Sequence, residues 1–342
     1  MGRLAVLACA AVALVAGVGD AGAVTGAGSS SSWATPQIKT VVAAGLMAPS
    51  VGQFRPGDPL TWSDFAVVLS SLGSPVTVTS APDRPVTMRE LDARLVTAVG
   101  LRPAARQLRL AALSAGLEPT EWLGTETVAR MLGLRVNHLR DQEQLELQLS
   151  QPATRAEAAY SIARVLSLQS SEIGRVEAAA DSFALPSLTA WQQIVLSRAL
   201  RFVGSPYVWG GTSEKPQELF GKLVPGGFDC SGFVWRVYKL EPFAHAPSLA
   251  GILKGRTTYA MSGEVVRSKR VPRARLRPAD LVFFGPNGPR SKPTQVAHMG
   301  IYLGNGWIVH AYDRGVALEP MVGWLDADFA WGRDPLAEAG LS

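Results

Sequence analysis

The stretch GGFDCSGFVW, residues 226–235, places Cys230 immediately before an apolar run. Apolar side chains with helical spacing follow the cysteine, so a helix is predicted to begin at or near it; they are Phe233, Val234, Val237 and Tyr238. Asp229 is a residue type that commonly caps a helix N-terminus. The unpaired amides and the positive end of the helix dipole favour the thiolate form of a cysteine there. The stretch therefore predicts a nucleophilic thiol.

The first 23 residues have the composition of a secretory signal peptide. Arg3 gives a positive start, residues 4–19 are apolar, and Ala21-Gly22-Ala23 has the small-x-small form of a cleavage site. A membrane anchor and lipidation of Cys9 are the alternatives, but the run is shorter than the roughly 20 apolar residues of a spanning helix. Cleavage would remove Cys9. Cys230 would then be a free reactive thiol, a buried and inert small hydrophobic residue, or a partner in an intermolecular disulfide.

The composition fits about two globular domains. Of the 342 residues, 47% are hydrophobic and 18% are charged, which excludes a fibrous or wholly disordered chain. The net charge of +5 suits an anionic partner, either a nucleic acid or a cell wall. The densest basic run, residues 267–277, has no interleaved aromatic residue, so we interpret it as a solvated loop and expect no nucleic-acid partner. The Cys and His residues lack zinc-ligand spacing, so neither a metal nor a cofactor is expected.

Residues 24–35 are predicted to form a flexible leader, and residues 36–170 a helical domain built from repeats. Thr61, Thr87 and Thr154 each have an acidic residue three positions later, which is the capping-box pattern of a helix start. A repeated helical unit buries its apolar face against copies of itself. The pattern resembles S-layer homology repeats, whose best-known tetrapeptide is reproduced by residues 154–157. The resemblance implies binding to wall polymers; a helical domain without a ligand is the alternative.

Residues 171–188 are predicted to form a linker, and residues 189–342 an α+β domain with an antiparallel sheet. A helix is expected from about Thr189 to Val203. Glycine, proline and aromatic residues then become frequent, and short runs typical of strands follow at residues 280–284, 298–303 and 307–311.

Two histidines, His298 and His310, lie on the two arms of a predicted hairpin whose turn contains Gly304-Asn305-Gly306. A cysteine nucleophile needs a base, and the base needs an orienting group. A two-residue turn would place the histidines on opposite faces of the hairpin. A three-residue loop would instead pair His310 with Gly300 and bring both histidines to one face. If both serve one site, the loop is therefore predicted to have three residues and a bulge; a buried structural histidine is the alternative.

Residues 200–335 resemble the NlpC/P60 family, which comprises papain-like cysteine peptidases secreted by bacteria. Six motifs in this order carry the resemblance: residues 206–211 (PYVWGG), 228–233 (FDCSGF), 256–257 (RT), 277–284 (RPADLVFF), 297–304 (AHMGIYLG) and 310–311 (HA). The sequence departs from the family pattern at Ala279, which replaces a usual glycine, and at residues 216–225, which form an insertion. The resemblance implies a papain-like fold in which N-terminal helices pack on an antiparallel sheet.

The resemblance also implies roles for individual residues. Cys230 would be the nucleophile, His298 the general base and acid, and His310 the orienting group. Tyr207 would line the cleft and steady the oxyanion. Asp229 and Ser231 would contact the substrate, although Asp229 is equally well explained as a helix cap alone.

The implied reaction is hydrolysis of the γ-D-glutamyl–diamino acid bond in peptidoglycan stem peptides, through a thioester on the cysteine. A papain-like amidase, an acyltransferase and a non-catalytic wall-binding protein are the alternatives. The protein is expected to be secreted and associated with the cell wall, with no stable membrane span after signal cleavage.

Overall fold

The structure, a computed structural model, describes residues 32–78, 80–138 and 146–341. These residues belong to one compact unit, Ser32–Ser342. The expected signal peptide, with Cys9, and most of the leader lie outside the described residues. Within the described residues, no helix combines the length and apolarity that crossing a membrane requires.

The N-terminal half of the described chain is helical. Its helices are α1 (Thr35–Ala43), α2 (Trp62–Ser71), α3 (Met88–Ala98), α4 (Arg102–Ser114), α5 (Leu123–Met131) and α6 (Arg155–Ser167). The predicted capping threonines are confirmed, because the hydroxyls of Thr61, Thr87 and Thr154 accept hydrogen bonds from the amides three residues later. Only Thr87 forms the reciprocal capping box, in which the Glu90 carboxylate returns to the Thr87 amide.

Backbone hydrogen bonds join the three capped helix starts in a ring. The Leu60 amide donates to the Ala153 carbonyl at 2.8 Å, the Ala153 amide to Val86 at 2.7 Å, and the Val86 amide to Leu60 at 2.8 Å. Each of these residues lies immediately before a capping threonine. Three equivalent segments therefore meet around a common centre, as expected for repeats that bury their apolar faces against one another.

The segment expected as a linker is largely helical, because α7 spans Ser170–Ser182 and buries Val176 and Ala180. Helix α8 (Ala190–Leu200) follows, with the hydroxyl of Thr189 accepting from the Gln192 amide at its start. The remaining helices are α9 (Cys230–Trp235), α10 (Pro247–Ala250), α11 (Thr258–Gly263), α12 (Trp324–Ala327) and α13 (Pro335–Glu338). A π-helical segment, Arg236–Leu240, continues directly from α9.

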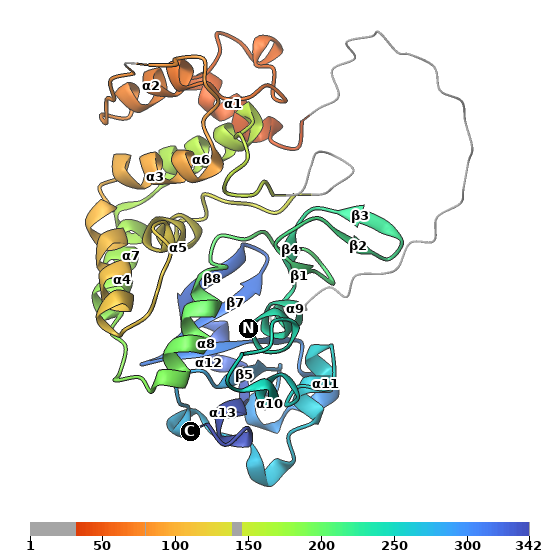
Figure 1. Cartoon of the computed structure of the whole chain (residues 1–342). Helices are drawn as coiled ribbons and strands as arrows, with labels where there is room; N and C mark the ends of the chain where they lie inside the picture. The colour runs from red at the N-terminus through yellow and green to blue at the C-terminus, as the bar shows by residue number, and fades with distance from the viewer. Residues whose placement is uncertain (1–31, 79, 139–145, 342) are drawn as a thin grey trace, which may run out of the picture. The chain divides into compact units, whose positions relative to one another are not determined.

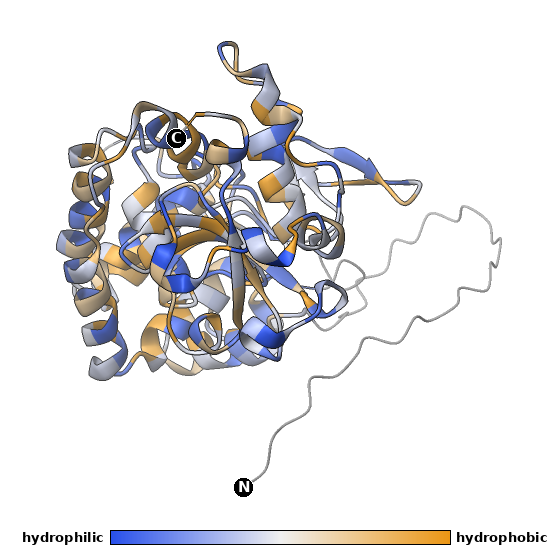
Figure 2. Cartoon of the chain, turned by 90° about the horizontal axis from the view of Figure 1, so that it is seen from below, coloured by the Kyte–Doolittle hydropathy of each residue, from blue (hydrophilic) through white to orange (hydrophobic). Residues whose placement is uncertain are grey.

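A five-stranded antiparallel sheet in the order β8-β7-β6-β5-β9 forms the centre of the C-terminal half (Figure 1). Its strands are β5 (Leu281–Phe284), β6 (His298–Gly304), β7 (Trp307–Tyr312), β8 (Gly315–Pro320) and β9 (Phe329–Arg333). Two small antiparallel pairs accompany it: β1 (Thr212–Ser213) with β4 (Gly227–Phe228), and β2 (Gln217–Leu219) with β3 (Lys222–Val224). Figure 2 shows that the strands of the central sheet are mainly apolar, consistent with their burial. The mixed helix and sheet architecture agrees with the expected α+β class.

The hairpin register of β6 and β7 agrees with the prediction that both histidines share a face. Ile301 pairs with Val309 and Tyr302 with Ile308, so Gly300 lies opposite His310. The loop itself differs from the prediction. Gly304 pairs with Trp307, which leaves a two-residue turn at residues 305–306 and a bulge between Tyr302 and Gly304. The bulge adds one unpaired residue, which has the same effect on the register as the expected third loop residue.

Buried charges connect α5 with the C-terminal half. Arg130 forms an ion pair with Glu146 at 2.7 Å and donates to the Gly204 carbonyl at 2.6 Å. The Arg314 guanidinium donates in turn to the Arg130 carbonyl at 3.2 Å. These contacts hold two segments in place: the segment at Gly204, which precedes Tyr207, and the turn between β7 and β8.

Candidate functional site

Cys230 is the first residue of α9, as the sequence predicted. The Asp229 carboxylate caps the helix by accepting from the Gly232 amide, and it also accepts from the Ser231 hydroxyl at 3.0 Å and the Gly210 amide at 2.9 Å. Both carboxylate oxygens are therefore engaged in local structure. Asp229 fixes the Cys230 turn against the segment that contains Gly210, which accounts for a cap role without any substrate.

The Cys230 thiol is half-buried and has polar neighbours. Its sulfur lies 3.3 Å from the Thr258 hydroxyl, and the backbone amides of Met299 and Ser231 also interact with it. Met299 directly follows His298 on β6, so the sulfur lies beside the strand that carries the proposed base. Sequence analysis missed Thr258, although the neighbouring Arg256-Thr257 motif was recognised.

The expectation that the helix N-terminus produces a thiolate is wrong for the resting structure. Burial raises the pKa of the Cys230 thiol to about 11, and the Asp229 charge adds to that effect. The Thr258 hydroxyl and the backbone amides lower the pKa but do not outweigh burial. The helix end carries only a partial charge, whereas removal from water acts on the whole charge of a thiolate.

His298 and His310 are hydrogen-bonded to each other. His298 Nε2 lies 2.7 Å from His310 Nδ1, and both side chains are buried. Burial and the neighbouring His310 lower the pKa of His298 well below its usual value, so the His298 ring is neutral near pH 7. In a neutral ring one nitrogen donates and the other accepts. If His298 Nε2 donates, its Nδ1 atom is left without a hydrogen and can act as a base.

Glu319 lies on the far side of His310. Its Oε2 atom lies 3.6 Å from His310 Nε2, and no described residue makes a hydrogen bond to that nitrogen. Burial alone would raise the pKa of Glu319, but His310 lowers it, so the side chain is a carboxylate. A carboxylate there favours the His310 tautomer with hydrogen on Nε2, which leaves Nδ1 free to accept from His298. Sequence analysis did not identify Glu319, because strand β8 was not predicted.

Aromatic rings surround the histidine pair. The rings of Tyr312, Trp324 and Phe284 lie 5.2, 5.4 and 5.6 Å from the His298 ring. These rings exclude water from the pair, which explains the direction of the His298 pKa and strengthens electrostatic interactions inside the site.

The other predicted site residues lie on the Cys230 side. Tyr207 forms an isolated bridge with Phe228, two residues before Cys230, and burial followed by the Cys230 charge raises the pKa of its hydroxyl. Ser231 is buried, and its hydroxyl accepts from Arg256 at 2.8 Å. Arg256 also donates to the Gly210 carbonyl at 2.9 Å. Tyr207 is therefore held beside Cys230, whereas Ser231 and Arg256 belong to the framework around it.

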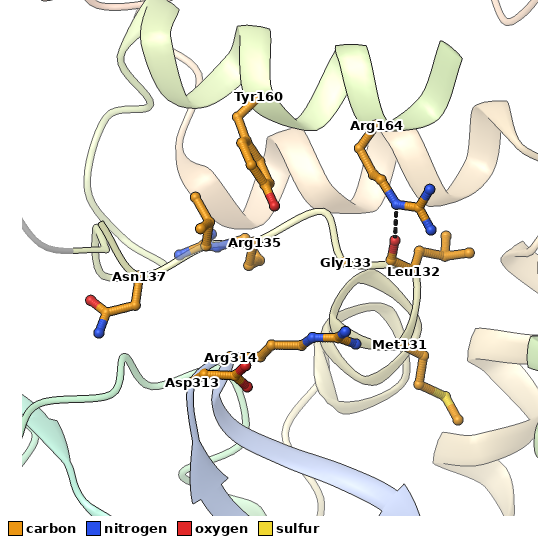
Figure 3. A pocket seen from close by; sticks show the side chains of 10 residues that line it. Met131, Leu132, Gly133, Arg135, Asn137, Tyr160, Arg164, Asp313 and Arg314 are labelled. Atoms are coloured by element: carbon orange, nitrogen blue, oxygen red, sulfur yellow. Dashed lines mark hydrogen bonds between the residues drawn. The ribbon is translucent and has the colours of Figure 1, made fainter. Parts of the chain in front are cut away.

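Three cavities lie near the β7–β8 turn, and the largest of them, about 580 Å³, is lined by Arg314, Glu319 and Trp324, among others. Two bear on the site. One of about 140 Å³ is lined by His310, Tyr312, Glu319 and Trp324, among others. The other, about 440 Å³, lies between α6 and this turn, and Figure 3 shows Tyr160 and Arg164 on one side and Arg314 on the opposite side. The second cavity contains none of the predicted catalytic residues. No group of three or more potential metal ligands occurs in the described part of the chain.

The arrangement supplies the parts of a nucleophilic hydrolase. A thiol at a helix N-terminus lies beside the strand of a neutral imidazole, and that imidazole is oriented by a second imidazole and a carboxylate. A base that is held in one tautomer can accept the thiol proton and later return a proton to a leaving amine. Nothing in this set requires a cofactor.

Comparisons with known proteins place this site within a known family. Residues 204–330 match the model of the NlpC/P60 family. The bifunctional muramidase/DL-endopeptidase CwlT of Bacillus subtilis (strain 168) is 31% identical over 144 residues, which are 41% of this chain and 36% of that protein. The probable peptidoglycan endopeptidase LytE of the same organism is 34% identical over 127 residues, which are 37% of this chain and 29% of that protein. The chain thus matches only about a third of the length of these curated relatives.

The structure of an NlpC/P60 family protein from Bacillus cereus ATCC 10987 also resembles part of the chain. It is 25% identical, covers 45% of this chain and 43% of its own, and has a TM-score of 0.32. The family match and the sequence relatives show that residues 204–330, which contain Cys230, His298 and His310, are an NlpC/P60 family domain.

Proposed function

We propose that the protein is a secreted peptidoglycan endopeptidase that hydrolyses the γ-D-glutamyl–diamino acid bond of stem peptides. The observation that carries the proposal is the placement of Cys230 beside the strand of a buried His298–His310 pair, inside an NlpC/P60 family domain. The relatives named as endopeptidases support the same reaction class. The papain-like arrangement, with α9 packed on β6 and β7, belongs to this proposal.

The reaction begins from a neutral thiol and a neutral imidazole. His298 accepts the Cys230 proton as the sulfur attacks the amide carbonyl, and the amides at the start of α9 with Tyr207 stabilise the oxyanion. His298 then protonates the leaving amine, and the C–N bond breaks to leave a thioester. Water attacks the thioester while His298 accepts its proton, which releases the acid and restores the thiol. His310 and Glu319 keep His298 in the required orientation throughout.

The test is mass spectrometry of purified muropeptides incubated with residues 24–342. Loss of the diamino acid portion from the stem is expected, and Cys230→Ala and His298→Ala should abolish it. Product identity separates the alternatives, because an amidase would release the whole stem and an acyltransferase would join the acyl group to an added amine. If neither the parent protein nor the variants change any muropeptide while all of them bind walls, the protein is a binding protein.

We further propose that residues 36–170 hold the enzyme at wall polymers through S-layer homology-like repeats, with residues 189–342 as the peptidase domain. The ring of backbone hydrogen bonds between three capped helix starts supports a repeat architecture. The charged residues of the 154–157 tetrapeptide make internal contacts: Arg155 binds the Phe54 carbonyl at 2.8 Å, and Glu157 binds His138 at 3.1 Å. Polymer contacts therefore need other groups.

The Arg314 guanidinium of the cavity in Figure 3 is suited to an anionic wall polymer, whereas Arg164 on the opposite side is already ion-paired with Glu172. In the Cys230→Ala background, which prevents release by hydrolysis, Arg314→Glu should reduce the fraction that sediments with purified walls. Unchanged sedimentation would remove this cavity from the proposal. Mature N-terminal sequencing of culture-supernatant protein tests export, and a start near residue 24 is expected.

A further inference from the structure

A projecting hairpin, β2–β3, lies in the insertion between the PYVWGG motif and the cysteine motif (Figure 1). Phe220 and Gly221 form its turn with φ values of 52° and 72°. This is the two-residue geometry in which both central residues are left-handed, and Asn-Gly is the usual pair there. A bulky phenylalanine is unfavourable in that conformation. The ring is therefore held at the hairpin tip at a conformational cost.

Two aromatic side chains beside this turn are exposed to solvent. Phe220 is 80% exposed and Trp209 is 73% exposed. The Phe220 ring lies against Gly210, because a Cβ placed on Gly210 would lie 3.2 Å from ring atoms Cε2 and Cζ of Phe220. Trp209 directly precedes that glycine. Adjacent exposed aromatic residues of this kind are typical of a binding surface.

The aromatic pair is fixed to the frame of the Cys230 site. The Gly210 amide donates to the Asp229 carboxylate at 2.9 Å, and the Gly210 carbonyl accepts from Arg256 at 2.9 Å. Asp229 in turn caps the helix that begins with Cys230. A ligand that contacts Trp209 and Phe220 is thus positioned relative to the thiol through a short series of hydrogen bonds.

The chemistry of the pair favours a sugar over a protein or an anion. One ring at the hairpin tip and one in the PYVWGG motif offer far less area than the roughly 1,000 Å² of a specific protein interface. The faces of aromatic rings carry partial negative charge, so they attract the polarised C–H groups of a pyranose and disfavour anions. If the proposed function holds, the stem peptide reaches Cys230 while covalently attached to the wall glycan. We infer that Trp209 and Phe220 bind an N-acetylhexosamine ring of that glycan and select sugar-bearing substrates.

Phe220→Asn provides a clean test, because Asn-Gly suits this turn and the substitution removes only the ring. The measurement is kcat/KM for two substrates with the same stem peptide, one carrying the disaccharide and one free of sugar. Phe220→Asn should lower kcat/KM for the disaccharide substrate about tenfold, the scale expected for one aromatic contact, and leave the sugar-free substrate unchanged. Phe220→Tyr, which keeps an aromatic ring, should retain the parent value of kcat/KM for the disaccharide substrate. Val67→Ser, which alters an apolar residue on α2 that is 66% exposed, is the matched control.

Equal effects on both substrates, or no effect on either, would overturn the inference. A binding measurement separates its failure from failure of the proposed reaction. In the Cys230→Ala background, calorimetric titration with the peptide-free disaccharide should give binding that Phe220→Asn abolishes. If the disaccharide binds but the parent protein hydrolyses no substrate, the proposed function fails and the sugar site stands. If hydrolysis proceeds and no disaccharide binds, the sugar site fails alone.

Discussion

Replacing Glu319 tests whether the carboxylate behind His310 acts in catalysis. Glu319→Gln keeps an oxygen that can accept from His310 Nε2 and removes the negative charge. Glu319→Leu removes both the charge and the acceptor. We expect kcat to fall in both variants, and further in the leucine variant, because the charge stabilises the imidazolium that forms on His298 and the acceptor fixes the His310 tautomer.

The separation of the groups sets the size of the effect. The Glu319–His310 distance is 3.6 Å and the His310–His298 distance is 2.7 Å, with one imidazole ring between them. At ~8 Å and an effective dielectric constant of ~20, a carboxylate and an imidazolium attract each other by ~2 kcal/mol. That energy corresponds to a loss of roughly 30-fold in kcat for Glu319→Gln. Losing the acceptor adds about 1 kcal/mol or more, so Glu319→Leu should lose well over 100-fold.

The assay is the pH dependence of kcat and kcat/KM on a soluble muropeptide. A nearby carboxylate favours the charged form of an imidazole, so its removal disfavours protonation of His298. The acidic limb of kcat/KM should therefore move to lower pH by about 1.5 units in Glu319→Gln. Glu157→Gln is the matched control, because Glu157 forms the comparable buried pair with His138. It should leave kcat and the pH profile unchanged.

Parent-like kcat in both Glu319 variants would refute the relay. So would a fall in kcat with an unmoved acidic limb, because a purely structural defect lowers the active fraction without changing a pKa. Nitrogen-15 spectra of the histidine rings provide the direct observation. The parent protein should show His310 with hydrogen on Nε2, and Glu319→Leu should show a mixture of tautomers.

Three further predictions follow from the site and its support. Alkylation of Cys230 by iodoacetamide should accelerate up to about pH 11, whereas a plateau below pH 8 would contradict the raised pKa. Burial raises the pKa of Asp280 to about 8, so the stability that its protonated form contributes is complete below about pH 4 and is lost as pH rises through 8. The urea midpoint of Asp280→Asn should therefore rise relative to that of the parent protein as the pH increases from 5 to 9. A difference between the two midpoints that stays constant over this range would contradict the prediction. Gly300→Ala would place a Cβ 2.9 Å from the His310 Cβ and should reduce kcat at least about tenfold with the far-UV spectrum retained, while Gly52→Ala, which meets no atom within 4 Å, should not.

Local patterns predicted the parts of the site that depend on local geometry. The apolar spacing after Cys230 and the cap residue Asp229 predicted the start of α9. Side-chain parity and the turn sequence predicted the hairpin register, because Gly300 opposite His310 places His298 and His310 on one face. The loop length was wrong, since a bulge gives the same parity as an extra loop residue. The alternation of side chains along the strands constrains the register, but it does not determine whether the extra residue lies in the loop or in a bulge.

Contacts between distant segments could not be predicted in the same way. Thr258 lies 28 positions after Cys230, and its hydroxyl reaches the sulfur only because α11 packs beside α9. Glu319 depends on strand β8, in which Ala317 pairs with His310 and places Glu319 diagonally across from it. A single glutamate in an unpredicted strand carries no local pattern. Its role becomes visible only when the neighbouring strand is known.

The protonation states of Cys230 and His298 before the reaction explain how Glu319 can affect kcat. The helix N-terminus was expected to favour the thiolate, whereas burial keeps both the Cys230 thiol and the His298 ring neutral. Positive charge on His298 therefore develops only as the sulfur attacks. The Glu319 charge then stabilises the transition state more than the ground state, which is the condition for raising kcat. Loss of Glu319 should accordingly reduce kcat with little change in KM, and loss of the Phe220 ring, which contacts bound sugar before and during reaction, should instead raise KM.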